Sequence, residues 1–473
     1  MAGILFVMEA ALNDVIVIGG GFAGIAAACR LAGDDHRPLL LERSPRLGGR
    51  AGSFFSPDRD ESLDYGQHVL MRCCTASTGF LLRIGASRAV RFQPTLSIPI
   101  VWPKGRTVLR SSPMPGVLHL APSLLRYRPL PLRDRIRAVR AGSSMSLRRI
   151  RADVPFAEWL EERGQSGRSI ERLWDPICVA SLNAPARAVG ARAAQKVFRD
   201  AFFRPDGADV GFFTVPLAEV FDAARRYIEG RGGAVRTSAT VEKLAIDRAG
   251  VRGVELSTGV TIEPEAVVSA VPPADLARLV PGDGPLAPLL AKASRLRWAP
   301  IVDVHAWFDR PVLEDEFAVA VDSPIQAVFD VARLHGRARS EGPAHLVLSQ
   351  SAAEGWIDRP VDEVSELLLS ALGDLFPRVR EAESLGTLVL RHRRATFVPG
   401  PGSERLRPRA VTPIPGLYLA GDWTSTGWPS TIEGAIRSGI VAAAHAEGRL
   451  TSEDGGSEER RTARRSGSAS GSG

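Results

Sequence analysis

The chain is poor in cysteine and has no long apolar run, and each shortage excludes a class of protein. Four cysteines occur among 473 residues. They lack the spacing of metal ligands, and the adjacent Cys73 and Cys74 are poorly placed for a disulfide with each other. We therefore expect a reducing compartment, no disulfide framework and no metal site. No stretch reaches the roughly 18 to 20 apolar residues that a membrane-spanning helix needs.

The two ends of the chain lack the marks of export and of folded structure. Residues 1–13, MAGILFVMEAALN, have no basic region and an apolar run of about five residues, which is not typical of a signal peptide; Met1 and Met8 are both candidate start residues. The C-terminal segment is rich in Ser, Gly and charge without an apolar period. We predict that residues 1–11 and 450–473 are disordered, and that the protein is cytoplasmic.

Lysine is scarce as well, so arginine carries nearly all of the positive charge. The formal net charge is +7, yet residues 126–151 alone hold nine Arg and one Asp, a net charge of +8. Because no nucleic-acid-binding motif accompanies this charge, we do not expect a nucleic acid partner.

Part of this segment, PLRDRIRAVRAG (131–142), predicts a basic amphipathic helix. Three apolar residues recur at helical spacing, Leu132, Ile136 and Val139. An arginine directly follows each of them: Arg133, Arg137 and Arg140. Each arginine near an anionic membrane surface contributes roughly 1 kcal/mol. We therefore predict peripheral contact with the inner face of the cytoplasmic membrane; a helix with one solvated face is the alternative.

Glycine, in contrast, is concentrated in a motif near the N-terminus. A short β-branched run, residues 15–18, reads as a buried strand, and Gly19, Gly21 and Gly24 follow it as G-x-G-x-x-G. The first glycine allows the tight turn, the second lets a phosphate approach the backbone, and the third lets the next helix pack against the strand. This spacing predicts a dinucleotide site.

The residues after the glycines support the same prediction. A helix is expected over 22–32, and its first residues, Phe22 and Ala23, would offer free N–H groups to a pyrophosphate. Glu42 ends a second strand 23 residues after Gly19, where a carboxylate can accept hydrogen bonds from ribose hydroxyls.

Two further motifs favour FAD over a nicotinamide. LGGRAGS (47–53) places Gly48 and Gly49 next to Arg50, which can pair with a phosphate or a flavin edge. An ordinary surface turn is the alternative there. Near the C-terminus, Gly421 and Asp422 end a strand, and the carboxylate can hydrogen-bond flavin ribityl hydroxyls.

The residues that follow predict a helix that faces the flavin. Ser430-x-x-Glu433 is typical of a capping box, so the helix should begin near Thr431 and Ile432. Its N-terminus would stabilise negative charge on the reduced flavin. A strand–helix pair that only completes the sheet is the alternative.

Together these motifs resemble the flavin amine oxidase and phytoene desaturase superfamily. A narrower resemblance, over residues 14–447, is to its squalene-associated FAD-dependent branch, the hydroxysqualene dehydroxylases. It rests on DYGQHVL (64–70), LWDPICVASLN (173–183), RRATF (393–397) and LAGDWTSTGWPSTIEGAIRSG (419–439). The resemblance implies an FAD enzyme of squalene and hopanoid biosynthesis, in which hydroxysqualene, a C30 isoprenoid, loses its hydroxyl and gains a hydride to give squalene. It adds Arg43 and the backbone of Val241 to the cofactor site, and it leaves open whether a synthase of the squalene pathway hands over the substrate.

The resemblance also implies an architecture. The fold class would be α/β, with a Rossmann-like FAD-binding domain whose parallel sheet is discontinuous in sequence. That domain would comprise residues 12–75, 212–285 and 410–447. An inserted α+β substrate domain would comprise residues 76–211 and 286–409.

For catalysis, the resemblance places Asp64, Gln67 and His68 near the flavin ring. Loss of water from an alcohol needs a proton donor, and His68 suits this by its ordinary pKa. Asp64 could hold the histidine tautomer or could itself be protonated in an apolar site. A loop in which both side chains satisfy backbone groups is the alternative.

Other residues are candidates for the substrate site or for structure. Eight aromatic residues could line an apolar tunnel or stabilise a cation: Trp174, Phe198, Phe202, Phe203, Phe212, Phe213, Trp307 and Phe397. Asp175 before a proline reads as a structural cap, and His305 lies on an alternating strand pattern as a satisfied sheet residue.

Two other activities remain open, an oxidative carotenoid or phytoene desaturase and a flavin amine oxidase. The second often uses a lysine near the flavin, and the surroundings of Lys292 do not match that motif. A non-enzymatic lipid-binding module would leave the flavin site unused.

Overall fold

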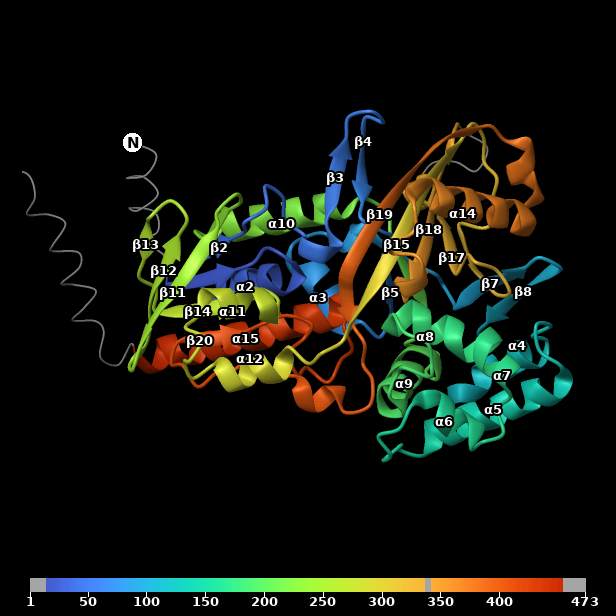
Figure 1. The fold of residues 1–473 in the computed structure, drawn as a ribbon, viewed down its shortest axis with the longest axis horizontal. Coiled ribbons are helices and arrows are strands. Elements are labelled where there is room, and N and C mark those ends of the chain that lie inside the picture. Colours follow the sequence, from blue (N-terminus) through green and yellow to red (C-terminus); the bar gives the residue numbers. More distant parts are fainter. Residues whose placement is uncertain (1–13, 337–341, 454–473) are drawn as a thin grey trace, which may run out of the picture.

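The computed structural model of the chain describes residues 14–336 and 342–453. One end of the molecule is built on a five-stranded parallel sheet (Figure 1). Across the sheet its strands are β10 (Ala234–Arg236), β2 (Pro38–Leu41), β1 (Val15–Ile18), β14 (Ala266–Ser269) and β20 (Leu417–Leu419). The strands β1, β2 and β14 are buried along their whole length, as their continuous apolar runs predict for a parallel sheet covered on both faces.

Alternate side chains of this sheet enter two different cores. Val15 and Val17 pack against helices on one face, whereas Ile16 and Ile18 pack against a small sheet and two short helices on the other. The first layer contains α2 (Phe22–Gly33), α10 (Leu217–Glu229) and α15 (Ile432–Glu453). The second contains β11 (Val241–Asp247), β12 (Gly250–Leu256), β13 (Thr261–Ile262), α11 (Pro273–Leu279) and α12 (Ala287–Ala293).

A seven-stranded sheet forms the other half of the molecule. Its order is β19 (Ser384–Phe397), β15 (Trp298–Phe308), β18 (Ala344–Ser351), β17 (Ala327–Asp330), β16 (Phe317–Ala320), β7 (Ser97–Trp102) and β8 (Gly105–Arg110). The pairing of β16 with β7 is parallel and the others are antiparallel. Helix α14 (Val361–Leu375) packs on one face through Val364 and Leu368.

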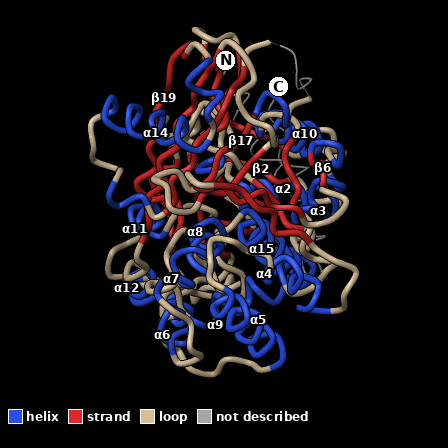
Figure 2. The backbone as a smooth tube through the Cα atoms, turned by 90° about the vertical axis from the view of Figure 1, so that its right-hand side faces the viewer, coloured by secondary structure: helices blue, strands red, loops and turns tan. Residues whose placement is uncertain are grey.

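A lobe of short helices lies at the end of this half away from α14 and β19 (Figure 2). Its helices are α4 (Ala121–Leu125), α5 (Leu132–Leu147), α6 (Phe156–Glu161), α7 (Gly167–Ser169), α8 (Asp175–Leu182) and α9 (Ala191–Val197). They share a core rich in aromatic residues, in which Phe156 contacts Trp159, Trp174 and Phe198.

Smaller elements connect the two halves. The hairpin of β3 (Ser53–Ser56) and β4 (Glu61–Asp64) stands beside β15 and β19 in Figure 1. A three-stranded sheet joins β5 (Val69–Met71), β9 (Val210–Phe213) and β6 (Val90–Phe92). The remaining helices are α3 (Thr75–Arg83) and α13 (Val331–Leu334). This arrangement is the α/β fold that the glycine motifs predict.

The C-terminal helix is longer than the sequence predicts. Disorder is expected from residue 450, but α15 continues to Glu453. Leu450 is 4% exposed and packs in the core below the parallel sheet, and this burial explains the error. The other predicted disordered residues, 1–11 and 454–473, lie outside the described residues. Within the described residues, no helix is long and apolar enough to cross a membrane.

The predicted basic helix is α5, but its apolar stripe does not face the core. Leu132 is 60% exposed and Ile136 is 40% exposed, while the buried positions include Ala138, Ala141 and Met145. Small side chains let the helix pack closely against the lobe. The larger apolar residues therefore lie on the outer surface with the arginines.

Candidate cofactor and substrate cavity

A large cavity, of about 1460 Å³, lies between the five-stranded and the seven-stranded sheet. Pockets for one small molecule usually measure about 300–1000 Å³, so this cavity has room for two ligands side by side. We call the part lined by residues 18–50, 239–242, 270–279 and 421–435 the cofactor half. The part lined by segments between 98 and 109, 171 and 202, and 301 and 351 is the substrate half.

The glycine loop shapes the wall of the cofactor half. Gly19 has a φ of 105°, and Gly48 has a φ of 115°; side chains other than hydrogen are strained in this region. Gly21 and Gly48 pair as an isolated bridge, so the two glycine motifs form one continuous backbone surface. A Cβ on Gly24 would lie 1.9 Å from the carbonyl oxygen of Gly19, which explains why the helix can follow the strand so closely.

Glu42 lies beside this loop. One of its carboxylate oxygens accepts a hydrogen bond from the backbone of Gly20 at 2.6 Å, and the other accepts one from Ser44 at 2.8 Å. The side chain is 8% exposed and lines the cavity. The acid is thus held at the end of β2, where the dinucleotide prediction requires it.

The predicted cofactor residues Arg50 and Asp422 form an ion pair across the cavity wall. Asp422 also accepts a hydrogen bond from the Ser430 hydroxyl. Burial alone would raise the pKa of the Asp422 carboxyl, but the Arg50 guanidinium and these hydrogen bonds hold it below its usual range. The carboxylate is therefore charged and fixed in place.

Arg407 also supports this loop, and no sequence motif points to it. It is 7% exposed and donates from Nη2 to the carbonyl oxygens of Asp422 and Thr424. Its guanidinium lies 5.1 Å from the ring of Phe397. A lone arginine in a chain rich in arginine gives no signal, so only the fold identifies it.

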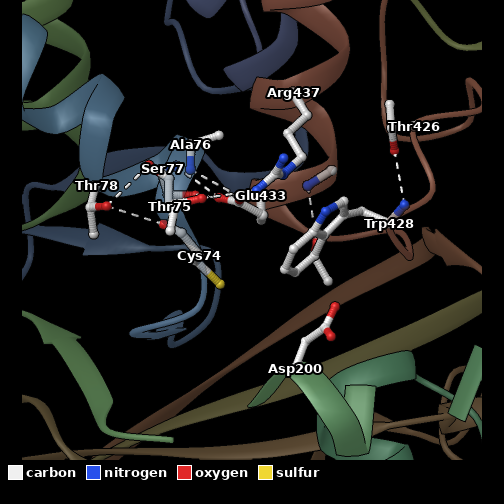
Figure 3. A network of polar contacts seen from close by, with 12 residues as sticks. Cys74, Thr75, Ala76, Ser77, Thr78, Asp200, Thr426, Trp428, Glu433 and Arg437 are labelled. Carbon is white, nitrogen blue, oxygen red and sulfur yellow. Dashed lines mark hydrogen bonds and ion pairs between the residues drawn. The ribbon is translucent and has the colours of Figure 1, made fainter. Parts of the chain in front are cut away.

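The predicted capping box at the start of α15 is wrong. The Ser430 hydroxyl bonds Asp422, and Thr431 Oγ1 instead accepts the backbone N–H of Gly434 at 3.2 Å. Glu433 pairs with Arg437 on its own helix and accepts the backbone N–H groups of Ala76 at 3.0 Å and Ser77 at 2.7 Å (Figure 3). A carboxylate favours the N-terminus of a helix, and here the helix it serves is α3.

Most predicted cofactor residues line one wall. They are Gly19, Gly21, Phe22, Ala23, Glu42, Arg43, Gly48, Gly49, Arg50, Val241, Gly421, Asp422, Thr431, Ile432 and Glu433. Gly24 lies behind this wall in the packing of α2. The N-termini of α2 and α15, the glycine surface and the fixed carboxylates fit the pyrophosphate, ribose and ring of a flavin dinucleotide.

The three predicted catalytic residues lie in two different environments. Gln67 and His68 line the cavity. His68 is half-buried, its Nδ1 has no hydrogen-bond partner among the described residues, and burial lowers the pKa of the ring to about 4. The ring is therefore neutral at pH 7 and is a weak proton donor.

Asp64 does not line the cavity. Its Oδ1 accepts hydrogen bonds from the Ser53 hydroxyl at 2.6 Å and from the backbone of Leu217 at 2.9 Å, so it caps the start of α10. Burial raises the pKa of Asp64 to about 6, although both hydrogen bonds oppose this rise. The structure thus supports the alternative expectation for Asp64, a side chain that satisfies a backbone group.

The wall of the substrate half is mainly aliphatic. Phe202 lines it, but the other aromatic residues predicted for a tunnel do not. Trp174, Phe198 and Phe203 line a separate pocket of about 30 Å³, and most of the remainder pack in hydrophobic cores. Aliphatic side chains such as Ile98, Leu173 and Val319 take their place. A mainly apolar wall suits a hydrocarbon chain; the ion pair on it, Lys196 with Asp200 at 2.6 Å, has side chains that are 34% and 39% exposed.

Hydrogen bonds fix three polar residues in or near this wall, of which the sequence marks Asp175 and His305 as structural. Asn183 is 5% exposed and donates to the Ala299 carbonyl at 3.3 Å and Thr396 Oγ1 at 2.9 Å. Asp175 accepts the backbone N–H of Ala186 at 2.6 Å, as expected of a cap. His305 is 1% exposed and bonds His345 at 2.9 Å.

Comparison with known proteins agrees with this geometry. The model of the flavin-containing amine oxidoreductase family matches residues 22–446. A hydroxysqualene dehydroxylase from Sinorhizobium fredii is 28% identical over 91% of this chain and 97% of its own length. A 15-cis-phytoene desaturase from Solanum lycopersicum is 24% identical over 91% of this chain and 77% of its own length.

Solved structures share the fold. An oxidoreductase from Methanosarcina mazei superposes with a TM-score of 0.71 at 19% identity, covering 91% of this chain and 99% of its own. A putrescine oxidase bound to putrescine gives a TM-score of 0.64 at 18% identity, covering 92% and 98%. The chain belongs to the flavin-containing amine oxidoreductase family, and it is a flavin-dependent oxidoreductase.

Proposed function

We propose that this oxidoreductase binds FAD in the cofactor half and reductively removes the hydroxyl of hydroxysqualene, giving squalene. The aliphatic substrate half beside the glycine surface carries this proposal, because a C30 hydrocarbon needs a long apolar wall next to the flavin. The hydroxysqualene dehydroxylase of Sinorhizobium fredii, which matches over nearly its whole length, supports the same substrate class.

The residues of the cofactor half would bind FAD, and those of the substrate half would hold the hydrocarbon. In the cofactor half, the helix N-termini and Gly21 would hold the pyrophosphate, and Asp422 would orient the ribityl chain. In its reduced form a bound flavin supplies a hydride. The substrate half would exclude water from the allylic carbon, so that the positive charge formed there meets hydride before it meets solvent.

The direct test uses anaerobically reduced holoprotein mixed with hydroxysqualene. Flavin absorbance is followed and the extracted lipid is analysed by mass spectrometry. We expect reoxidation of the flavin with one squalene formed per flavin. Reduced flavin that persists beside untouched alcohol, in protein shown to be folded, would contradict the proposal.

The second candidate is oxidative desaturation of a carotenoid precursor, which the 24% identical phytoene desaturase supports. Oxidised holoprotein is mixed with phytoene in parallel, and reduction of the flavin with loss of two hydrogens from the lipid would favour this activity. An amine oxidase is less well supported, because Lys292 lies on α12 and does not line the cavity.

We also propose that the helical lobe contacts an anionic membrane surface. Five large apolar side chains of residues 114–136 are at least 40% exposed, among the arginines of the same segment: Met114, Leu118, Leu125, Leu132 and Ile136. Beneath them, the small pocket is lined by Val117, Leu124 and Val139. It shares Leu109, Leu173, Ile177 and Phe202 with the large cavity, so an apolar layer connects the surface to the substrate half.

Vesicle sedimentation tests this surface. Replacing Leu132 and Ile136 by Ser should lower binding to vesicles of phosphatidylglycerol and phosphatidylcholine about tenfold, because two exposed apolar contacts are lost. The matched control replaces Val361 and Leu367 on α14, which are 50% and 39% exposed at the opposite end. Equal loss in both variants would overturn a specific docking surface.

A further inference from the structure

Among the titratable side chains that line the substrate half, Asp303 is the most deeply buried. Asp303 lies on β15, is 2% exposed and lines the cavity. A role for Asp303 in the site could not be predicted from the sequence, because IVDVHAWF is typical of an ordinary apolar strand that contains two polar residues. Burying an ionisable side chain costs free energy, and Asp303 is buried where the lining carboxyls Asp200 and Asp322 keep 39% and 36% of their side chains exposed. A chemical role for Asp303 would account for this cost.

The two oxygens of Asp303 have different surroundings. Oδ1 accepts a hydrogen bond from the hydroxyl of Ser349, the residue opposite it on β18. Oδ2 has no hydrogen bond among the described residues, and it lies against the backbone of Gly66, where a Cβ would approach it to 2.4 Å. Because Ser349 occupies Oδ1 as a donor, a proton on the carboxyl resides on Oδ2.

The groups around Asp303 do not stabilise its charged form. The neighbouring titratable side chains are His68 in the Gly66 loop, His305 on its own strand and His392 on β19. Burial lowers the pKa of all three imidazoles, that of His68 and of His305 to about 4. They are neutral at pH 7 and offer no cation to stabilise a carboxylate. Burial raises the pKa of Asp303 to about 7, and the Ser349 hydrogen bond opposes this rise.

We propose that Asp303, and not His68, protonates the leaving hydroxyl of the substrate from Oδ2. This inference rests on the proposed dehydroxylation. The C–O bond breaks and its electron pair stays on oxygen, which takes the Asp303 proton and leaves as water. The allylic carbon receives a hydride, for which reduced flavin is the source, and Asp303 remains as a carboxylate. Atoms and charge balance, because one alcohol, one proton and one hydride give one hydrocarbon and one water.

Gly66 leaves room for the Asp303 carboxyl because it has no side chain. Any Cβ at this position would push Asp303 away from the loop that also carries Gln67 and His68. Gly66 is therefore a positioning residue, and its replacement by Ala should disturb the pH profile as well as the rate.

The test compares Asp303→Asn with Asp64→Asn, which changes another buried carboxyl of raised pKa that lies outside the cavity. Single-turnover dehydroxylation should fall 10²- to 10⁴-fold in Asp303→Asn, the usual contribution of a positioned acid, and remain within about threefold in Asp64→Asn. In the wild type the rate should decline as pH rises through about 7. Asp303→Glu should restore part of the rate with a shifted pH profile.

Infrared spectroscopy gives a readout that needs no substrate. The wild type should show a protonated-carboxyl C=O band that disappears as pH rises through about 7 and is missing in Asp303→Asn. Full activity in Asp303→Asn, or loss of the pH-dependent limb in His68→Gln instead, overturns the assignment. An inactive wild type contradicts the dehydroxylase proposal itself, and with it this role, so the two failures are told apart by the wild-type turnover.

Discussion

The two halves of the cavity are built from different materials. The cofactor half is made of backbone groups, glycines and paired charges, and its parts come from both ends of the chain; Arg50 and Asp422 are 372 positions apart. The substrate half is a mainly apolar wall; among its lining carboxyls in the described residues Asp303 is deeply buried, at 2% exposed, whereas the side chains of Asp200 and Asp322 are 39% and 36% exposed. The first half recognises a ligand through directed hydrogen bonds, whereas the second recognises shape and excludes water. Substitutions should therefore separate cofactor binding from substrate use.

The largest effect should come from the glycine loop. In Gly24→Val the new side chain meets the Gly19 carbonyl, since even a Cβ would lie 1.9 Å from that oxygen. We expect a loss of about 3 kcal/mol or more in stability, with flavin absent from the purified protein. Visible flavin absorbance and thermal unfolding measure both. Gly79→Ala on α3, where a Cβ meets nothing within 4 Å, is the control and should retain flavin.

A smaller effect is expected from the charge pair of the cofactor half. Arg50→Gln leaves the buried Asp422 carboxylate without its guanidinium, and we expect a loss of about 2 kcal/mol, moderated because the Arg50 side chain is 39% exposed. The lowered pKa of Asp422 contributes stability that is present above the unfolded pKa of about 3.9 and is lost as pH falls below it. In Arg50→Gln the folded pKa of Asp422 should rise toward or above the unfolded value, so this acid-linked loss of stability should shrink or disappear.

Urea unfolding at a series of pH values measures that shift. Arg252→Gln removes a surface pair with Asp247 whose partners are 59% and 51% exposed, and it should leave the urea midpoint nearly unchanged at every pH. If both variants behave alike, the Arg50–Asp422 pair is an ordinary surface contact.

Asp64→Asn should change the pH dependence of stability. Because burial raises the pKa of Asp64 to about 6, the folded state binds an extra proton between pH 4 and 6, and stability falls as pH rises through this window. The amide keeps an oxygen for Ser53 and Leu217 but cannot ionise, so the slope should flatten by about one proton. Asp303, whose pKa burial raises to about 7, contributes a further falling slope up to about that pH. An unchanged slope would show that Asp64 titrates as an exposed acid.

The mildest change concerns the substrate half alone. Ile177→Asn places an unpartnered amide in the apolar wall that both pockets share. We expect substrate binding to weaken about tenfold, or 1–2 kcal/mol, with flavin content unchanged. Ile177→Leu, which conserves volume, should bind normally. Flavin loss in Ile177→Asn would mean that the two halves are not independent.

The same division explains what could be predicted from the sequence. Gly19, Gly48 and Glu42 lie in short local patterns, so the strands, the turn and the flavin site could be inferred from spacing. Glu433 was misassigned because its partners, Ala76 and Ser77, are distant in sequence. A tertiary contact decided between two helix N-termini that the same carboxylate could cap.

The substrate half was less predictable for a related reason. Aliphatic residues that line a cavity and aliphatic residues that fill a core have the same pattern, so the aromatic tunnel was expected and an aliphatic wall was found. Asp303 and His305 share one face of β15, yet only the packing of the Gly66 loop against that face shows which of them reaches the cavity.

The distance in sequence between Arg50 and Asp422 has a consequence for biogenesis. A ribosome releases the chain N-terminus first, at about 5–20 residues per second, so the glycine loop emerges long before β20, the Asp422 turn and α15. Until those last segments arrive, the parallel sheet lacks an edge strand, α2 lacks the helix that packs against it, and α3 lacks the Glu433 cap. The cofactor half is therefore complete only after residues 417–453 have left the ribosome, and a chain that stalls before residue 417 keeps the apolar faces of β14 and α2 uncovered.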